Sequence, residues 1–317
     1  MPQRELLESL LDEAAELRID RARSVRLCET VLGVSDGRFP AIAARAWRLI
    51  GHARLYDSDF PRATEAYTQS RGRAEALGDS AQVAHALMGL GEVAQRSGDT
   101  TTALLRFRAA KEQAPEDFGS AWLIHNHLGN VLNAVGRHEE ALEHYDLCRA
   151  EMDDRTPARR AAVVLGNIGV VHALRGDLGQ ATGFFEGAAR QWERTVPVAG
   201  TATNLGNLGK VYCLMGESER GIPLQATAIR LMGEMGYLDG QMEEYIKLAE
   251  SLEHLGNTEG AVEAYRQALE LARPLELHGG ERIVRAALAR LVADPAEAEH
   301  HRRYRENHGG QNPSEMA

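Results

Sequence analysis

Small and apolar residues recur along the chain about every 40 residues. A small residue stands in the middle of each of six apolar segments, and the intervals between them are 40, 38, 40, 40 and 40 residues. These anchors are Gly51, Gly91, Gly129, Gly169, Gly209 and Ala249. Seven residues after each anchor stands a turn residue, in order Ser58, Gly98, Gly136, Gly176, Gly216 and Gly256. Glycine takes positive φ easily after a helix end, so each turn residue predicts the end of one helix.

Three further columns follow each turn and predict a second helix. The first column holds Ala63, Ala103, Ala141, Ala181, Gly221 and Ala261. Four residues later comes a mostly aromatic column with Tyr67, Phe107, Tyr145, Phe185, Gln225 and Tyr265. Three residues after that stand Ser70, Ala110, Cys148, Ala188, Ala228 and Ala268. Spacing of i, i+4 and i+7 is typical of a helix buried along one side, so each segment predicts an antiparallel helical hairpin.

A hairpin that is apolar on both sides buries its surface only by stacking on the next hairpin, so the expected fold is an all-α solenoid. Ser120, and Thr156 followed by Pro157, are expected to begin two of the first helices. Six hairpins cover residues 41–274. The other expected parts are a divergent helix pair in 1–40 (Glu5–Leu17 and Arg21–Leu32, broken by Gly33 and Gly37 before Pro40), capping helices in 275–308 (Glu281–Val292 and Pro295 to about Asn307) and a flexible tail in 309–317.

Composition and charge narrow the classes of partner. The net charge of -10 would repel a phosphate backbone, so we do not expect nucleic acid as a partner. The first eleven residues mix charges among leucines, and the sequence contains no run of 18 apolar residues, which argues against a signal peptide and a membrane span. The odd number of cysteines, Cys28, Cys148 and Cys213, suits reduced thiols. We therefore expect a cytoplasmic protein.

The columns of residues 41–274 resemble the signature of the tetratricopeptide repeat, whose usual unit has about 34 residues. Trp47 occupies the aromatic position before Gly51, and Pro274 ends the sixth repeat where the family often has proline. The longer unit resembles the long-helix repeats of kinesin light chains, polarity-complex adaptors and Rap-type bacterial peptide-sensing regulators. This resemblance implies a right-handed superhelix whose first helices line a concave groove that binds a polypeptide.

The groove side of each first helix is expected at offsets of −6, −3, −2, +1, +4 and +5 from its anchor, which share one arc of the helix. The candidate peptide-binding residues on this side are Arg48, His52, Glu92, Gln95, Asn126, His127, Asn130, Asn133, Asn167, Asn207, Lys210 and Lys247. Asparagine is unfavourable inside a helix, and its amide can both donate to and accept from an extended backbone. In related proteins concave asparagines do this, which is what the resemblance implies for Asn126, Asn130, Asn167 and Asn207. The alternative is that these amides are solvated or bridge adjacent helices.

Several residue patterns look like catalytic or metal-binding motifs, but the predicted helices around them exclude that function. Gly89, Gly91 and Ala94 imitate a dinucleotide-binding loop but lie inside a predicted helix. His125 and His127 point to different sides of their helix, and His300 and His301 are expected in a polar tail. We therefore expect no cofactor, no metal and no enzymatic activity.

Two hypotheses about function remain open. The first is a non-catalytic adaptor or scaffold that holds a partner segment in the groove. The second is a bacterial signalling sensor whose superhelix responds to a small peptide. A homo-oligomer through the terminal repeats is also open, because exposed repeat faces stack readily.

Overall fold

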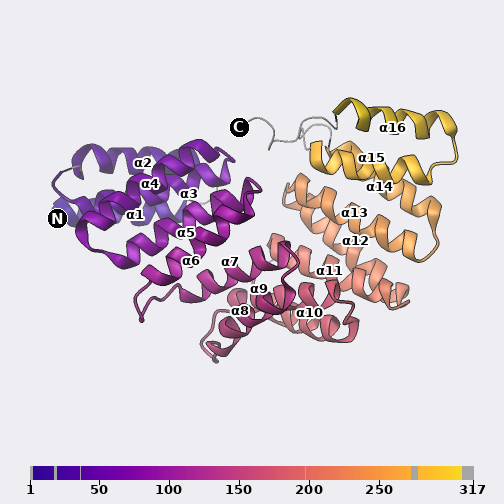
Figure 1. Ribbon diagram of the computed structural model, residues 1–317, viewed down its shortest axis with the longest axis horizontal. Coiled ribbons are helices and arrows are strands. Elements are labelled where there is room, and N and C mark those ends of the chain that lie inside the picture. The colour runs from indigo at the N-terminus through magenta and orange to yellow at the C-terminus, as the bar shows by residue number, and fades with distance from the viewer. Residues whose placement is uncertain (1–2, 18–19, 36, 197, 273–277, 309–317) are drawn as a thin grey trace. The chain divides into compact units, whose positions relative to one another are not determined.

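The computed structural model describes residues 3–17, 20–35, 37–196, 198–272 and 278–308. These residues form sixteen α-helices and no strand, in two compact units, Met1–Glu151 and Met152–Ala317. Within each unit, consecutive helices form antiparallel pairs (Figure 1). The expected all-α fold, a right-handed α-solenoid of antiparallel helix pairs, is confirmed. The division between the two units was not predicted, since the columns continue through it.

The N-terminal unit has four hairpins. Its helices are α1 (Gln3–Glu16), α2 (Arg21–Ser35), α3 (Pro40–Tyr56), α4 (Phe60–Leu77), α5 (Ser80–Arg96), α6 (Thr100–Gln113), α7 (Ala121–Ala134) and α8 (His138–Ala150). Gly33, expected to break the second helix, lies inside α2, which continues to Ser35. Gly37 follows with φ +82°, so the backbone turns there instead.

The C-terminal unit has four hairpins as well. Its helices are α9 (Ala158–Leu174), α10 (Leu178–Trp192), α11 (Ala199–Leu214), α12 (Ser218–Glu234), α13 (Leu238–His254), α14 (Thr258–Ala272), α15 (His278–Leu291) and α16 (Pro295–His308). The expected flexible tail, residues 309–317, and Pro274 lie outside the described residues. Among the residues that are described, every helix is too short or too polar to cross a bilayer.

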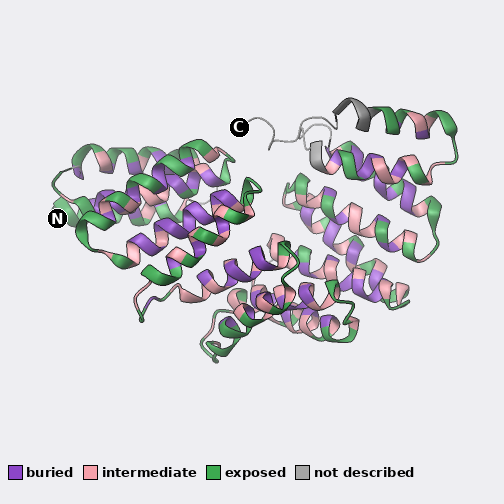
Figure 2. Cartoon of the chain, viewed as in Figure 1, coloured by how far each residue is buried: buried purple, intermediate pink, exposed green. Residues whose placement is uncertain are grey.

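Four hairpins, α3 with α4, α5 with α6, α7 with α8 and α9 with α10, are each closed by a ring that lies on the anchor glycine of the first helix. A Cβ atom added at Gly129 would lie 2.6 Å from the Tyr145 ring, and one added at Gly169 would lie 2.9 Å from Phe185. At these four anchors a larger residue would collide with the ring, which is why glycine and an aromatic residue occur together there. Buried residues follow the sides where helices of one unit meet (Figure 2). The turn residues also behave as predicted: even Ser58 has φ +58°.

The expectation for Ser120 is confirmed, because it stands at the N-cap of α7, although its side chain makes no capping hydrogen bond. Two other local expectations were wrong. Thr156 does not cap α9, because its hydroxyl donates to Asp153 Oδ1 and Pro157 stands at the cap position. His301 is not a tail residue: it is only 6% exposed and its Nδ1 lies 3.2 Å from Arg285 Nη1. The polar helix α16 is therefore attached to α15 through buried polar groups.

Candidate functional site

The candidate site is the side of the first helices that the anchor offsets define, here called the first-helix face. In the N-terminal unit it belongs to α3, α5 and α7, and in the C-terminal unit to α9, α11 and α13. Within a unit, first helices of successive hairpins contact each other. For example, α3 contacts α5, and α11 contacts α13. Side chains at these positions can therefore act together within each unit.

Arg48 on α3 is a half-buried cation without an acidic partner among the described residues. Its Nε atom is buried and has no hydrogen-bond partner. Burial, and then the nearby charge of Arg45, lower the pKa of Arg48. Arg45 itself is neutralised by Asp12, with 2.6 Å between Nη2 and Oδ1. The unit thus holds a guanidinium whose hydrogen-bonding capacity is not used internally.

His85 on α5 lies close enough to Arg48 for the guanidinium charge to affect the pKa of its imidazole. Burial and then Arg48 lower the pKa of His85 to about 4, so its imidazole is neutral at pH 7. The same ring contacts Phe118, with 4.7 Å between the ring centroids. Because His85 does not compete as a cation, Arg48 supplies the positive charge of this part of the face.

Glu92 on α5 and His127 on α7 connect neighbouring hairpins, with 3.2 Å between Glu92 Oε1 and His127 Nε2. The His127 ring stacks on Phe107 at 4.8 Å and 5°, which fixes its orientation. Its Nδ1 atom is buried and makes no hydrogen bond. Gln95, one turn after Glu92, is half-buried. His52 on α3 instead contacts Tyr56, with 4.7 Å between centroids.

The asparagines of α7 are partly used inside the protein. Asn126 is only 5% exposed. The Asn130 Oδ1 atom accepts a hydrogen bond of 2.7 Å from the Tyr145 hydroxyl, and Asn133 Oδ1 lies 2.9 Å from His138 Nδ1. These contacts correspond to the alternative in which the amides bridge helices.

In the C-terminal unit the candidate lysines are paired. Lys210 Nζ lies 2.5 Å from Glu250 Oε2, which joins α11 to α13. Lys247 Nζ lies 2.7 Å from Glu244 Oε1. Asn167 on α9 and Asn207 on α11 are half-buried on their helices. The charge of each lysine is therefore balanced by a glutamate of the same unit.

Sequence reasoning missed Glu244 and Asn204, which stand five residues before their anchors. In the other four repeats Ala46, Ala86, Ile124 and Val164 fill this buried column. Glu244 is 1% exposed, its Oε2 atom has no partner, and burial raises its pKa. Asn204 Nδ2 donates to the Phe185 carbonyl oxygen at 3.0 Å. The signal was available, because a polar residue in an apolar column of a repeat protein is conspicuous.

The sequence also missed a histidine pair: His125 and His144 lie with their Nδ1 atoms 2.9 Å apart. Lys111 and Arg108 lie near this pair, and their charges disfavour a bound cation. Within the described ranges, no group of three or more His, Cys, Asp or Glu side chains could hold a metal ion.

Comparisons with known proteins support the repeat. Residues 120–188 and residues 245–274 match models of the family described as tetratricopeptide repeat. A comparison with curated protein sequences finds no significant match.

Similar solved structures cover most of the chain at low sequence identity. The apo form of the quorum sensor NprR from B. thuringiensis has a TM-score of 0.74 and 12% identity, over 95% of this chain and 86% of that chain. A Rap protein complexed with competence and sporulation factor has a TM-score of 0.63 and 16% identity, over 95% and 89%. The hetero-tetramer Cut9-Hcn1 of the APC/C has a TM-score of 0.65 and 15% identity, over 91% and 52%.

The matched segments contain three of the predicted hairpins in part or whole, and the ring-on-glycine contact extends from Gly51 with Tyr67 to Gly169 with Phe185. At these identities the solved structures establish the fold alone. The chain contains tetratricopeptide repeats, at residues 120–188 and 245–274.

Proposed function

We propose that this protein is a non-catalytic adaptor or scaffold that holds a segment of a partner polypeptide along the first-helix face. The observation that carries the proposal is the unused hydrogen-bonding capacity of Arg48 Nε and His127 Nδ1, both buried on that face. Buried polar atoms in folded proteins are nearly always hydrogen-bonded, so those without a partner indicate where a ligand belongs. Carbonyl groups or carboxylates of a peptide would satisfy the Arg48 guanidinium. We also place the protein in the cytoplasm, where its three buried free cysteines would stay reduced.

A second candidate is a sensor that responds to a small peptide. It is supported by the similarity of fold over nearly the full length to a quorum sensor and to a Rap protein in complex with a sporulation factor. In a sensor, the peptide would bind one arrangement of the repeats better than another. Small-angle X-ray scattering separates the candidates: compaction on adding a peptide ligand favours the sensor, and an unchanged envelope with a tightly bound protein favours the adaptor.

The first prediction concerns this face and uses a matched control. Asn130→Ala and Tyr145→Phe both remove the hydrogen bond between Asn130 and Tyr145, so each should lower the free energy of unfolding by about 1 kcal/mol. Asn130→Ala also removes the whole amide from the first-helix face, whereas Tyr145→Phe keeps it, and Arg48→Met removes the guanidinium. Affinity purification from native lysate should therefore retain a partner with wild type and Tyr145→Phe, and lose it with Asn130→Ala and Arg48→Met.

Denaturant unfolding of each variant checks the stability half of this prediction. If the partner persists with Arg48→Met and Asn130→Ala, the first-helix face is not the binding surface. If Tyr145→Phe loses the partner as completely as Asn130→Ala, Asn130 has only a structural role.

A further inference from the structure

The first helices of the N-terminal unit carry an excess of positive charge. Helices α3, α5 and α7 together hold four arginines and one glutamate, whereas α9, α11 and α13 of the C-terminal unit hold four arginines and lysines and five carboxylates. The whole chain has a net charge of -10. The positive charge of α3, α5 and α7 is therefore a local feature, opposite in sign to the charge of the protein as a whole.

Arg48 is the arginine of this face whose charge is not balanced. Arg45 is ion-paired with Asp12, and the exposed Arg96 donates from Nη1 to the Leu55 carbonyl oxygen at 2.8 Å. Arg48 is half-buried, its Nε atom is buried without a hydrogen-bond partner, and it makes no ion pair with any residue that the structure describes. Burial removes part of the water around the guanidinium, and no counter-charge offsets that loss.

The groups near Arg48 supply no negative charge. Burial, and then the charge of Glu92, raise the pKa of Tyr67, so its hydroxyl stays protonated at pH 7. Burial and the charge of Arg48 lower the pKa of His85 to about 4, so its imidazole is neutral. The Glu92 carboxylate lies 3.2 Å from His127 Nε2 and thus belongs to the contact of α5 with α7. One positive charge remains where α3 meets α5.

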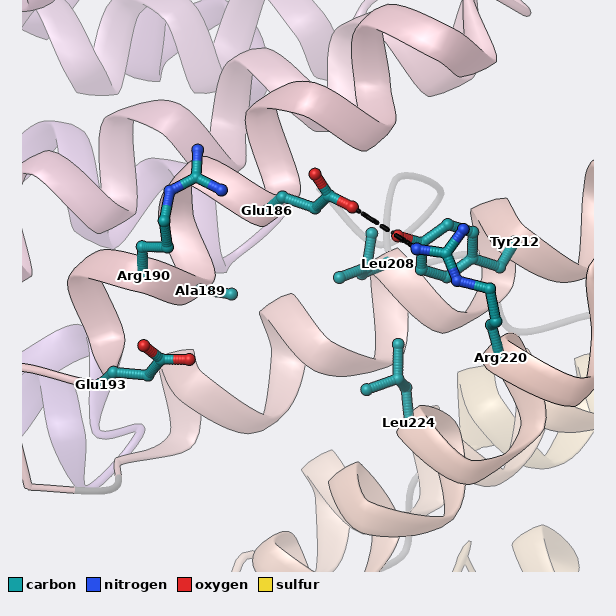
Figure 3. A pocket seen from close by; sticks show the side chains of 8 residues that line it. All are labelled: Glu186, Ala189, Arg190, Glu193, Leu208, Tyr212, Arg220 and Leu224. Atoms are coloured by element: carbon teal, nitrogen blue, oxygen red, sulfur yellow. Dashed lines mark hydrogen bonds and ion pairs between the residues drawn. The ribbon is translucent and has the colours of Figure 1, made fainter.

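A pocket in the C-terminal unit is the opposite case. This open pocket of about 590 Å³ lies between α10 and α12, beside Tyr212 of α11 (Figure 3). The charged residues that line it are two carboxylates and two guanidinium groups, Glu186, Glu193, Arg190 and Arg220. The Tyr212 hydroxyl donates to Glu186 Oε1 at 2.6 Å and accepts from Arg220 Nη2 at 2.5 Å. Because its charges balance, this pocket does not select a ligand by charge.

An acidic side chain satisfies Arg48 better than the other oxygen groups that a protein partner offers. A carbonyl oxygen would accept a hydrogen bond but leave the charge uncompensated, whereas a carboxylate supplies one negative charge and can accept two parallel hydrogen bonds. A phosphorylated side chain carries about −1.5 to −2 charges, more than this single cation balances. Since α3 contacts both α1 and α5, Arg48 does not lie at the end of the array, and a segment that crosses it would present an internal side chain.

We propose that Arg48 selects an aspartate or glutamate side chain of the bound segment and so fixes the acidic residue where α3 meets α5. This inference deepens the proposed function and rests on it, because the segment is taken to lie along the first-helix face. The net charge of -10 disfavours acidic peptides at long range, so a preference for acid would have to come from such a local contact.

The experiment is a selection from a displayed library of random peptides, fused to their carrier through the C-terminus, against the full chain. Peptides of about ten residues span about 33–36 Å when extended, enough to cross three helices packed about 10 Å apart. We expect wild type to enrich peptides with aspartate or glutamate at one fixed position. Arg48→Met should lose this preference, and Arg48→Glu should enrich lysine or arginine at that position. Lys210→Met is the matched control: this cation of the first-helix face is already paired with Glu250, so the preference should persist.

Isothermal titration of one enriched peptide and its amide counterpart, with asparagine or glutamine at the acidic position, gives the magnitude. Wild type should bind the amide peptide at least about tenfold more weakly, whereas Arg48→Met should bind the two peptides within about twofold of each other. Arg48→Met should not lower the midpoint of thermal unfolding, because the buried guanidinium has no internal counter-charge to lose. A lowered midpoint with an unchanged peptide preference would make Arg48 a structural residue instead.

The outcomes separate this inference from the proposed function. Enriched peptides that Asn130→Ala fails to bind, but that share no acidic position, would overturn the inference and leave the proposed function standing. An acidic preference that persists in Arg48→Met would place the carboxylate elsewhere. Tighter binding with phosphoserine at the acidic position, or binding only of peptides with a free C-terminus, would assign Arg48 to a different anion. If no enriched peptide depends on the first-helix face, both proposals fail.

Discussion

The His125 and His144 rings meet in the hairpin of α7 and α8, at positions where other repeats carry mostly apolar side chains. Leu87, Leu165 and Leu205 correspond to His125 along the repeats, and Phe184 and Leu224 correspond to His144. Burial lowers the pKa of both rings, and for His144 the charges of His125, Lys111 and Arg108 lower it further, to about 4. Both rings are therefore neutral at pH 7, with one Nδ1 donating to the other.

The second prediction follows from this pair. Since the folded pKa lies below the ordinary value of 6.5, the pair's contribution to stability is present above pH 6.5 and is lost as the pH falls towards 4. His125→Leu with His144→Phe removes the titrating groups and restores residue types that other repeats use. Chemical denaturation of wild type and double variant between pH 7 and pH 4 should show a smaller loss of stability in the variant. Parallel pH profiles would contradict it.

At the scale of elements, α12 lies closer to α11 than a ring would allow. Gln225 replaces the aromatic residue, and Gly221 replaces the alanine. A Cβ atom added at Gly221 would lie 2.5 Å from the Gly209 carbonyl oxygen and 2.4 Å from Cys213 Sγ. The amide of Gln225 is fully buried and donates to Ser251 Oγ at 2.9 Å. The two departures from the repeat pattern thus belong to one local packing arrangement.

The third prediction is that Gly221→Ala destabilises the protein although alanine is the residue of the other repeats. Replacing glycine by alanine inside a helix normally stabilises by about 0.5–1 kcal/mol. At Gly221 the added methyl group would force α11 and α12 apart, and overpacking of this kind typically costs about 1–3 kcal/mol. Thermal unfolding should show a lower midpoint for Gly221→Ala. Gly183→Ala in α10 is the control, because nothing lies within 4 Å of its added Cβ, and its midpoint should rise. A rise for both variants would refute the packing argument.

The sequence predicted the hairpins because each depends on local spacing: anchor, turn and ring contacts all lie within one repeat. The sequence prediction ended α2 too early because it took Gly33 for the turn residue. Gly33 is an ordinary helical residue, and the glycine with positive φ is Gly37. The prediction mistook His301 for a tail residue because the residues around it in α16 are polar, while its burial depends on Arg285 of the preceding helix. A contact between helices that does not recur from repeat to repeat leaves no signature at a fixed spacing.

The sequence predicted which positions form the candidate site, but it did not predict which of their side chains are already hydrogen-bonded or ion-paired inside the protein. The offsets place Arg48, His127 and the asparagines on first helices, but which of them are already engaged depends on partners in other helices. Tyr145 engages Asn130 from α8, and Glu250 engages Lys210 from α13. The same is true of the pocket beside Tyr212, which three helices form together.

At the scale of the whole molecule, contacts within each unit run between consecutive helices and between most first helices of successive hairpins. Each hairpin therefore depends on its neighbours for burial, and the stability of such an array is approximately a sum of local terms. Phe107 shows how local the terms are: it is fully buried, its ring lies on Gly91 of α5, and His127 of α7 stacks on it at 4.8 Å. One side chain thus connects α5, α6 and α7.

The fourth prediction is that damage at Phe107 stays local. Phe107→Ala leaves a cavity among α5, α6 and α7, and truncation of a buried phenylalanine typically costs about 3–5 kcal/mol. Native-state hydrogen exchange followed by mass spectrometry should show faster exchange in these three helices and nearly unchanged exchange in α13 and α14, because partial opening of a linear array does not require distant repeats to unfold. Leu105→Ala on the same α6, where the side chain is 61% exposed, is the control and should leave exchange unaltered. If Phe107→Ala instead accelerates exchange equally from α1 to α16, the array unfolds as one cooperative unit and the additive description fails.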